Sequence, residues 1–228
     1  MSQDSPAHHF LHLKSRIDEI ARDCNRNPED IQLVAVTKYC SKEMVEQVYE
    51  FGGRDFGESR IQEGIEKVLT LPEDIRWHFI GSLQLNKVSK AVQYFNLIHS
   101  VDSFKLAKKI SEVSIQMGID IPILLEVNTS GEITKHGFTI EECREKFDEL
   151  NQLPNIILEG LMTIAPFTTD EKVIRRCFSQ LRELREELRV RAKDPLLFCH
   201  LSMGMSNDYS IAIEEGATIL RIGSAIFK

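Results

Sequence analysis

The sequence predicts an α/β protein built as a single (β/α)8 TIM barrel with an extra helix at the N-terminus. Eight short apolar segments rich in β-branched residues alternate with helical segments along the whole chain. Strict alternation favours a parallel sheet with right-handed crossovers, and eight units favour a closed barrel over an open doubly wound sheet. No glycine-rich dinucleotide-binding motif follows the first strand, which further weakens the open-sheet alternative.

The first element is an amphipathic helix from about 8 to 24. Its apolar residues recur at three- and four-residue spacing, which is typical of one buried helix face: Phe10, Leu13, Ile17 and Ile20. A turn at 27–30 leads to the first strand, 33–37, which carries no charge. Ser41 then caps a helix that runs to about residue 51 and ends at a pair of glycines.

The same unit then repeats. Further strands are expected at 55–57, 77–80, 97–101, 122–127, 158–164, 198–201 and 219–222. Each of them except the last is followed by a helix, and these helices are expected to end near residues 69, 95, 117, 150, 191 and 216. A polar loop, 128–137, separates the fifth strand from its helix. No linker or low-complexity segment divides the chain, so we expect one domain over residues 1–228.

The composition argues against several classes of protein. The 228 residues are 42% hydrophobic and 28% charged, as in a soluble globular domain, and the net charge of −7 argues against a nucleic-acid-binding surface. No apolar run approaches the roughly 20 residues that span a bilayer, and the polar N-terminus lacks a signal-peptide core. We therefore expect a cytoplasmic protein with neither a nucleic-acid nor a membrane partner.

Five scattered cysteines without a CxxC pair fit reduced thiols in the cytoplasm rather than a disulfide framework. Each is interpreted as a core or surface residue, and Cys40 is of interest because it lies two residues after Lys38. No cluster of His, Cys, Asp and Glu has metal-ligand spacing, so we expect no metal.

The most informative segment is the first strand with the lysine that follows it, Leu33-Val34-Ala35-Val36-Thr37-Lys38. In a barrel of this kind the active site lies at the C-terminal ends of the strands, so Lys38 is expected at the mouth. Burial lowers the pKa of a lysine and frees its lone pair, which makes Lys38 a candidate Schiff-base nucleophile. The alternative is that Lys38 only marks where the strand leaves the core.

Small residues follow the seventh and eighth strands, where such barrels often bind phosphate. Ser202, Gly204 and Ser206 lie between the seventh strand and its helix, and Gly223 and Ser224 follow the eighth. Glycines allow close backbone approach, and free N–H groups with a helix dipole favour an anion. The alternative is that Ser206 is only an N-cap and Gly223 only a turn. A Schiff-base lysine and a phosphate cup in one mouth indicate pyridoxal 5′-phosphate, which carries both an aldehyde and a phosphate.

Arg221 precedes Gly223 by two residues and so lies beside the expected cup. It could bind the phosphate or hydrogen-bond the pyridine nitrogen. In the second case the nitrogen stays unprotonated, because arginine does not give up its proton, and the ring is a weak electron sink. The alternative is a salt bridge with an acidic neighbour such as Glu58. His78, on the third strand, could donate to the ring region or be a hydrogen-bonded strand-end histidine.

Several segments together resemble the family of pyridoxal phosphate homeostasis proteins. They are Val36–Lys38, Phe56–Glu58, Trp77–Gly81 with Leu83-Gln84 and Asn86-Lys87, Glu126–Asn128 with Gly131-Glu132 and Lys135–Phe138, Gly160–Met162, Leu201–Ser206 and Arg221–Gly223. The resemblance runs from about residue 10 to the C-terminus and implies a barrel like the N-terminal domain of alanine racemase. It also implies a Schiff base on Lys38, phosphate contacts from Ser202, Gly223 and Ser224, and Arg221 at the pyridine nitrogen.

The residues expected to bind the cofactor are Lys38, Ser59, His78, Ser202, Met203, Gly204, Ser206, Arg221, Gly223 and Ser224. The chain departs from the family pattern at two places. Ser59 stands where family members usually have asparagine, and its shorter side chain could weaken a contact near the cofactor. The chain also ends at Lys228, where the family usually continues with glycine and a few more residues.

Three functions fit these residues. The first is a non-enzymatic, monomeric carrier of pyridoxal 5′-phosphate, involved in vitamin B6 homeostasis, with pyridoxal-phosphate-dependent apo-enzymes as recipients. The second is an amino-acid racemase that uses the cofactor. The third is a class I aldolase-type barrel without the cofactor, which the first-strand lysine and the arginine beside the cup disfavour. We expect the carrier, because an open mouth suits loading and release.

The racemase alternative needs a second base on the face of the substrate opposite Lys38. In alanine racemases this base is a tyrosine from a further domain, for which we expect no room after Ser224. Tyr39 and Tyr209 are the tyrosines near the expected mouth, and neither has an evident activating partner.

Overall fold

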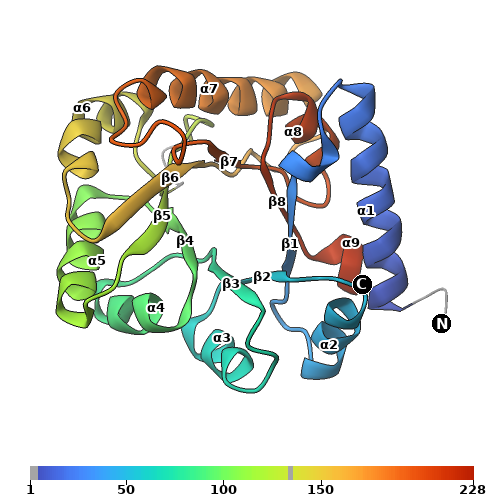
Figure 1. The fold of residues 1–228 in the computed structure, drawn as a ribbon. Helices are drawn as coiled ribbons and strands as arrows, with labels where there is room; N and C mark the ends of the chain where they lie inside the picture. The colour runs from blue at the N-terminus through green and yellow to red at the C-terminus, as the bar shows by residue number, and fades with distance from the viewer. Residues whose placement is uncertain (1–4, 133–135) are drawn as a thin grey trace.

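Eight parallel strands close into a barrel in sequence order, and β8 pairs with β1 to complete it (Figure 1). The structure is a computed structural model that describes residues 5–132 and 136–228. Its strands are β1 (Gln32–Val36), β2 (Asp55–Glu58), β3 (Arg76–Phe79), β4 (Leu97–Val101), β5 (Ile121–Glu126), β6 (Ile156–Met162), β7 (His200–Ser202) and β8 (Ile219–Ile222). The predicted (β/α)8 barrel is confirmed.

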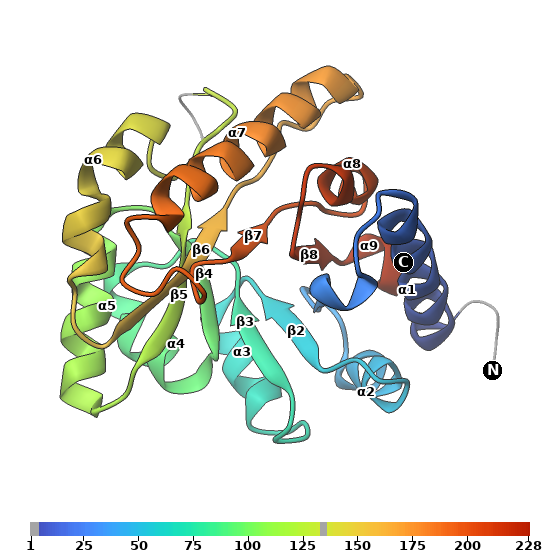
Figure 2. The same cartoon turned by 45° about the horizontal axis from the view of Figure 1, so that its top comes forward.

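Helices surround the barrel, as the tilted view in Figure 2 shows. They are α1 (Pro6–Asp23), α2 (Lys42–Glu50), α3 (Ile61–Val68), α4 (Val88–Tyr94), α5 (Phe104–Met117), α6 (Ile140–Asn151), α7 (Glu171–Arg189), α8 (Tyr209–Glu214) and α9 (Ser224–Phe227). Two 3-10 helices, η1 (Pro28–Asp30) and η2 (Leu85–Lys87), complete the elements of the described residues. None of these helices is both long and apolar enough to cross a membrane.

The extra N-terminal helix α1 is present and packs against α2, α8 and α9. Its four predicted core residues are all buried. Just beyond the helix, Arg26 donates hydrogen bonds of 2.8 and 2.7 Å to the carbonyl oxygens of Ile213 and Ala217. The beginning of the chain is therefore fastened to its end on the outside of the β8–β1 junction (Figure 1).

Several strand bounds differ from the prediction by one or two residues, and two differences near the end of the chain have a physical reason. β7 begins at His200 rather than at 198, because Phe198 is fully buried and packs edge-on against Phe147 outside the barrel sheet. The chain also ends in a short helix, α9, where the alternation pattern predicted none. Four residues are too few to give a periodic signal in the sequence.

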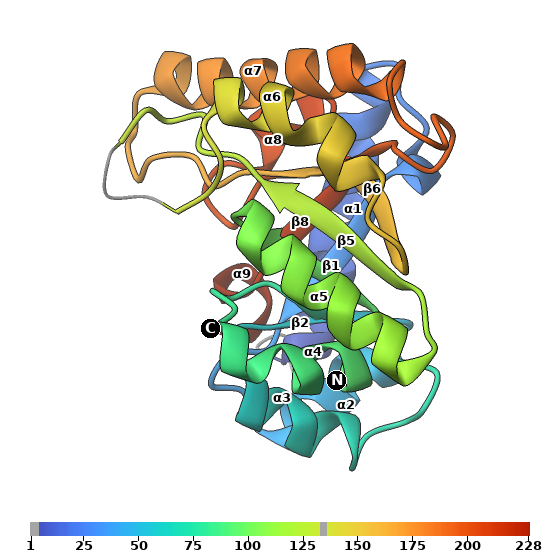
Figure 3. The same ribbon diagram turned by 90° about the vertical axis from the view of Figure 1, so that its left-hand side faces the viewer.

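Strand residues alternate between the barrel interior and the layer under the helices. Val34, Leu97, Leu124, Met162 and Ile219 form a small apolar cluster of their own within the barrel. Their strand neighbours belong to the main core, which lies between the strands and the helices. The side view in Figure 3 shows α9 and the loop after β5 at the end of the barrel toward which the strands point. We call this end the mouth.

Candidate functional site

Lys38 lies at the mouth, in the turn that follows β1. Val34 points into the barrel, and Lys38 lies two residues beyond Val36, where β1 ends at the mouth. The side chain is exposed, which corrects the prediction that it is buried, because β1 ends at Val36 and the chain then leaves the sheet. Its Nζ atom lies 4.9 Å from the centroid of the Tyr39 ring. The amine is therefore accessible from the mouth.

Tyr39 gives this turn its shape. Its φ angle is 66°, in the left-handed region that residues other than glycine seldom adopt, and such strain gathers at functional sites. The guanidinium carbon of Arg60 lies 4.8 Å from the same ring, and Arg60 donates a 3.0 Å hydrogen bond to the Tyr39 hydroxyl. The Tyr39 ring thus contacts both the Lys38 ammonium and the Arg60 guanidinium on the exposed side of the turn.

A buried ion pair supports the turn from below. Glu58, at the end of β2, accepts 2.5 Å hydrogen bonds from the Thr37 hydroxyl and from Lys67 Nζ. Lys67 also donates at 2.7 Å to the Thr37 carbonyl, directly before Lys38. The other carboxylate oxygen of Glu58 is buried without a partner among the described residues.

Cys40, the cysteine nearest to Lys38, is not activated. Burial raises the pKa of the Cys40 thiol to about 11, so Cys40 is a neutral thiol rather than a nucleophile at neutral pH.

The loops after β7 and β8 meet beside this turn. Residues 35 and 222 are partners in the β1–β8 ladder, so the two strands end together. A Cβ atom on Gly223 would lie 3.1 Å from the carbonyl oxygen of Val36, which shows how closely the β8 loop approaches β1. The backbone N–H of Ala225 donates to the Ser206 hydroxyl at 3.3 Å. Gly223, Ser224 and Ser206 therefore lie in adjoining loops next to the strand that carries Lys38.

Gly204 must be a glycine in this arrangement. Its φ angle is 96°, and a Cβ atom would lie 2.6 Å from Ala212 Cβ and 2.8 Å from a methyl group of Leu220. The carbonyl of Gly204 accepts the Arg221 N–H at 3.0 Å. The carboxylate of Asp208 then accepts the N–H of Met205 at 2.6 Å and fixes the turn into α8.

Arg221 lies below these loops and is only 5% exposed. Its guanidinium donates to the Ser202 hydroxyl at 2.5 Å and to the Thr163 carbonyl at 2.9 Å. Burial lowers the pKa of Arg221 to about 10, against the charges of Glu126 and Asp208, so the group stays protonated at neutral pH. The alternative salt bridge with Glu58 is wrong, because Glu58 points away from the interior and pairs with Lys67.

Glu126 supplies a half-buried carboxyl group at the end of β5. Burial raises its pKa, the charge of Asp102 adds to the rise, and the charges of Arg221 and His136 oppose it. A carboxyl group with a raised pKa near a buried arginine is common at binding sites.

Two of the predicted residues have side chains that turn away from the mouth. Met203 is fully buried in the core under the helices, on the strand face opposite Ser202, so only its backbone borders the loop. His78 is buried inside the barrel, and both ring nitrogens have partners: His99 at 2.9 Å and Asp55 at 3.1 Å. The prediction that His78 could donate toward the mouth is therefore wrong for this arrangement, whereas the hydrogen-bonded alternative is confirmed.

Ser202 and Ser59 remain close to the site. The Ser202 hydroxyl is fully buried between Arg221 and His99. Ser59 follows β2 at the mouth and is half-buried, and its backbone packs against Gly81, where a Cβ would overlap the Ser59 carbonyl. His99 is not among the predicted site residues, because nothing in its own strand marks it and its partner Ser202 is 103 residues away.

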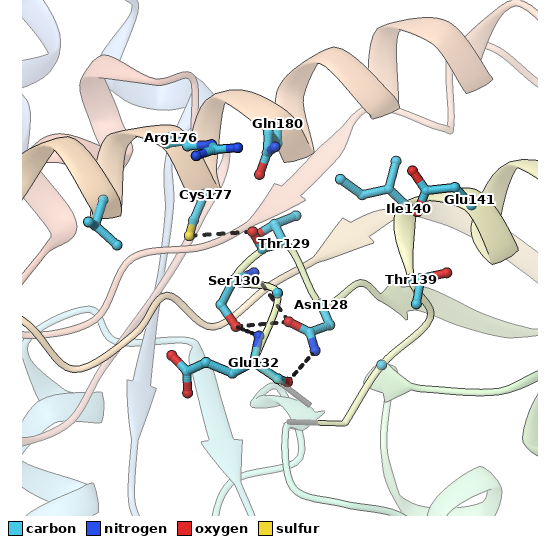
Figure 4. A pocket seen from close by; sticks show the side chains of 13 residues that line it. Asn128, Thr129, Ser130, Glu132, Thr139, Ile140, Glu141, Arg176, Cys177 and Gln180 are labelled. Atoms are coloured by element: carbon cyan, nitrogen blue, oxygen red, sulfur yellow. Dashed lines mark hydrogen bonds between the residues drawn. The ribbon is translucent and has the colours of Figure 1, made fainter. Parts of the chain in front are cut away.

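A pocket of about 650 Å³ lies beside the mouth, between the loop after β5 and α7 (Figure 4). Asn128 organises this loop: it accepts from the Ser130 hydroxyl at 2.8 Å and donates to the Glu132 carbonyl at 2.9 Å. Arg176 and Gln180 border the pocket from α7. None of the ten predicted cofactor-binding residues lines it. The candidate site is therefore the mouth itself, at the β8–β1 junction.

Two other features bear on the sequence predictions. Lys135, one of the residues that carry the family resemblance, lies outside the described residues. Within residues 5–132 and 136–228, no group of three or more His, Cys, Asp and Glu side chains is arranged to hold a metal ion.

Comparison with known proteins identifies the family. The family model described as the N-terminal domain of alanine racemase matches residues 11–228. The pyridoxal phosphate homeostasis protein of Aquifex aeolicus is 40% identical over 213 residues, which cover 93% of this chain and 92% of the relative. The protein of the same name from Homo sapiens is 38% identical over 231 residues, covering 94% and 84%.

Solved structures agree. PipY of Synechococcus elongatus PCC7942, solved with PLP bound, has a TM-score of 0.81 at 36% identity and is matched over 93% of this chain and all of its own. Alanine racemase of Clostridium difficile 630 has a TM-score of 0.73 at 18% identity over 95% of this chain and 56% of its own, which shows a shared fold. The chain therefore belongs to the alanine racemase N-terminal domain family and, within it, to the pyridoxal phosphate homeostasis proteins.

Proposed function

We propose that this protein binds pyridoxal 5′-phosphate at the mouth of the barrel, covalently through Lys38, and serves intracellular vitamin B6 homeostasis as a carrier of the cofactor. The observation that carries the proposal is the meeting of three groups at the β8–β1 junction. These are the exposed amine of Lys38, the adjoining loops at Ser206 and Gly223, and the buried guanidinium of Arg221. PipY, at 36% identity, was solved with PLP bound.

The residues present suit the group. Lys38 supplies the amine, which condenses with an aldehyde and releases water. Gly223 and Gly204 let the two loops pack closely against their neighbours, and the loop backbone with the Ser206 and Ser224 hydroxyls would hold the phosphate. Arg221 would face the pyridine nitrogen as a donor that keeps its own proton. When bound, the cofactor supplies an aldehyde that reacts with amines and an electron-accepting ring.

The described residues favour a carrier over a racemase. Racemisation requires a second base on the face of the substrate opposite Lys38. The Tyr39 hydroxyl lies in a hydrogen bond with Arg60, and Tyr209 packs against the core. The guanidinium of Arg221 would also weaken the ring as an electron sink. We further propose that the protein works as a monomer in the cytoplasm and passes the cofactor to apo-enzymes that depend on it.

Borohydride reduction of the protein loaded with pyridoxal 5′-phosphate, followed by peptide mass spectrometry, tests the proposal. We expect a pyridoxyl adduct on Lys38 and a visible absorption band that is lost in Lys38→Ala. Lys42→Ala is the matched control, because Lys42 is an exposed lysine four residues away that pairs with Glu46 on the same helix face. An adduct on another lysine, or no adduct, would contradict the proposal.

A second measurement separates the carrier from the racemase. Amino acids are incubated with the loaded protein in D2O, and deuterium at the α-carbon and loss of optical purity are followed. The carrier function predicts neither at a rate above free pyridoxal 5′-phosphate. Rapid exchange that requires Lys38 would establish the racemase instead. Cleavage of a sugar phosphate by protein free of the cofactor would favour the aldolase.

A further inference from the structure

A chain of buried hydrogen bonds crosses the interior of the barrel below the mouth. The guanidinium of Arg221 on β8 donates a 2.5 Å hydrogen bond to the Ser202 hydroxyl on β7, and this hydroxyl lies 2.9 Å from Nδ1 of His99 on β4. Nε2 of His99 forms a 2.9 Å hydrogen bond with Nδ1 of His78 on β3. Nε2 of His78 forms a 3.1 Å hydrogen bond with the Asp55 carboxylate on β2. All five side chains are buried. We call these five residues the interior relay.

The two ends of the relay fix the protons next to them. A guanidinium can only donate, so Ser202 accepts from Arg221. An ionised carboxylate can only accept, so Nε2 of His78 carries a proton. Between the ends, the tautomer in which Nε2–H of His99 donates to Nδ1 of His78 is the one that leaves Nδ1 of His99 to accept the Ser202 proton. Each hydrogen bond therefore runs from Arg221 toward Asp55.

The charge states of the groups agree with this direction. Burial raises the pKa of Asp55, but the hydrogen bonds from His78 and Arg76 outweigh it and the net pKa is lowered, so Asp55 is ionised. Burial holds the pKa of His99 well below its usual value, so His99 is neutral. Between the charged ends of the relay, each group in this arrangement donates one hydrogen bond and accepts one.

The far end of the relay is anchored at the other side of the barrel. Asp55 accepts 2.7 Å hydrogen bonds from the Gln32 amide and from the Arg76 guanidinium as well as the bond from His78. Three donors therefore hold the Asp55 carboxylate in place as the acceptor at this end of the relay. At the mouth, Arg221 is held at two points, Ser202 and the Thr163 carbonyl.

We propose that His99 is a positioning residue of the cofactor site, which acts through Ser202 to hold the Arg221 guanidinium in the orientation that meets the pyridine nitrogen. The proposal rests on the proposed binding of pyridoxal 5′-phosphate. His99 does not touch the mouth. It accepts the Ser202 proton, which turns a lone pair of the Ser202 oxygen toward Arg221. Without that acceptor the hydroxyl is free to rotate, and Arg221 loses one of its two fixed contacts.

The first test needs no cofactor. ¹⁵N NMR of the histidine rings in the full-length apoprotein at pH 7.5 reports which nitrogen carries the proton. We expect Nε2, and not Nδ1, to carry the proton in both rings. A doubly protonated His78, or a proton on Nδ1 of His99, would reverse the relay and overturn the inference whether or not the protein binds a cofactor.

The second test compares three variants by titration with pyridoxal 5′-phosphate. His99→Leu removes the acceptor and should weaken binding about tenfold, the order expected for losing a hydrogen bond to a charged group, and shift the visible absorption maximum. His99→Asn keeps an acceptor near the Nδ1 position and should lie closer to wild type. His200→Leu is the matched control, because His200 bonds Thr218 at 3.2 Å and lies outside the relay.

The outcomes separate this inference from the proposed function. If wild type forms the Lys38 adduct but His99→Leu keeps wild-type affinity and spectrum, or His200→Leu changes them equally, the positioning role is wrong and the carrier function stands. If wild type forms no adduct on Lys38, the proposed function fails, and the positioning role fails with it. If His99→Leu does not fold, the NMR measurement on wild type together with His99→Asn decides.

Discussion

The Nζ atom of Lys67 lies 2.7 Å from the carbonyl oxygen of Thr37, the residue directly before Lys38. The same ammonium pairs with Glu58, which is fully buried. One lysine of α3 therefore fixes the backbone from which a second lysine reaches into the mouth.

Lys67→Met should be strongly destabilising. It leaves the buried Glu58 carboxylate without its cation, which typically costs about 3–5 kcal/mol of the free energy of unfolding. Urea denaturation measures the effect, and the double variant Lys67→Met/Glu58→Leu should recover most of it. Lys42→Met is the control, because its 3.6 Å pair with Glu46 is exposed and should be worth about 0.5 kcal/mol or less. A loss below that of the control would contradict a supporting role for Lys67.

Gly204→Ala should cost more stability than Gly118→Ala. Both glycines have positive φ angles, 96° and 67°, so both substitutions carry backbone strain. A Cβ at Gly118 meets nothing within 4 Å, whereas one at Gly204 meets Ala212 and Leu220. The difference between their unfolding free energies should be about 1–3 kcal/mol, the usual cost of overpacking. Equal losses would mean that the loop after β7 relaxes freely.

The stability should fall as the pH drops below about 6.5, the ordinary pKa of histidine, because of His99. Burial holds the folded-state pKa of His99 well below that value, so His99 binds a proton in the unfolded chain but not in the folded protein. The free energy of unfolding therefore decreases by up to about 1.4 kcal/mol per pH unit for this one group, and the loss stops only below the folded-state pKa. Urea midpoints from pH 7.5 to 5 measure it.

His99→Leu should have a shallower pH dependence than wild type over the same interval. The comparison is needed because burial also lowers the pKa of His200, so the wild-type slope contains at least two groups. Parallel slopes for the two proteins would show that His99 is protonated in the folded state.

The prediction of a single domain also leads to a measurement. Trp77, the one tryptophan of the chain, lies on β3 and is 2% exposed. Its fluorescence should change in the same urea transition as the far-ultraviolet circular dichroism of the helices, because one cooperative unit unfolds all at once. Two separated transitions would indicate that the barrel is not one unit.

The barrel and its family could be predicted from the sequence because both depend on short patterns of neighbouring residues. Alternating segments predict strands and helices, and the short motifs around Lys38 and Gly223 are among the segments that resemble the family. Ser202 and Met203 show that the sequence pattern does not predict the orientation of every side chain. They are adjacent in a small-residue loop motif, yet the strand places one in the interior and the other under the helices. Strand β7 has only three residues, so the alternation of polar and apolar residues is too short to predict which side chains point into the barrel.

The exposure of the Lys38 side chain and the role of His99 could not be predicted from the sequence. Lys38 is exposed because β1 ends two residues before it, and a strand end is not defined more closely than that by composition. His99 depends on Ser202, Arg221 and His78, which come together only when the barrel closes. Contacts across such long separations leave no local signal.

The closure of β8 onto β1 has a consequence for the nascent protein. Lys38 leaves the ribosome long before the loop at Gly223 that completes its surroundings. A polypeptide stalled before β8 would present the lysine without the neighbouring loop, so the proposed site can form only after β8 has been synthesised.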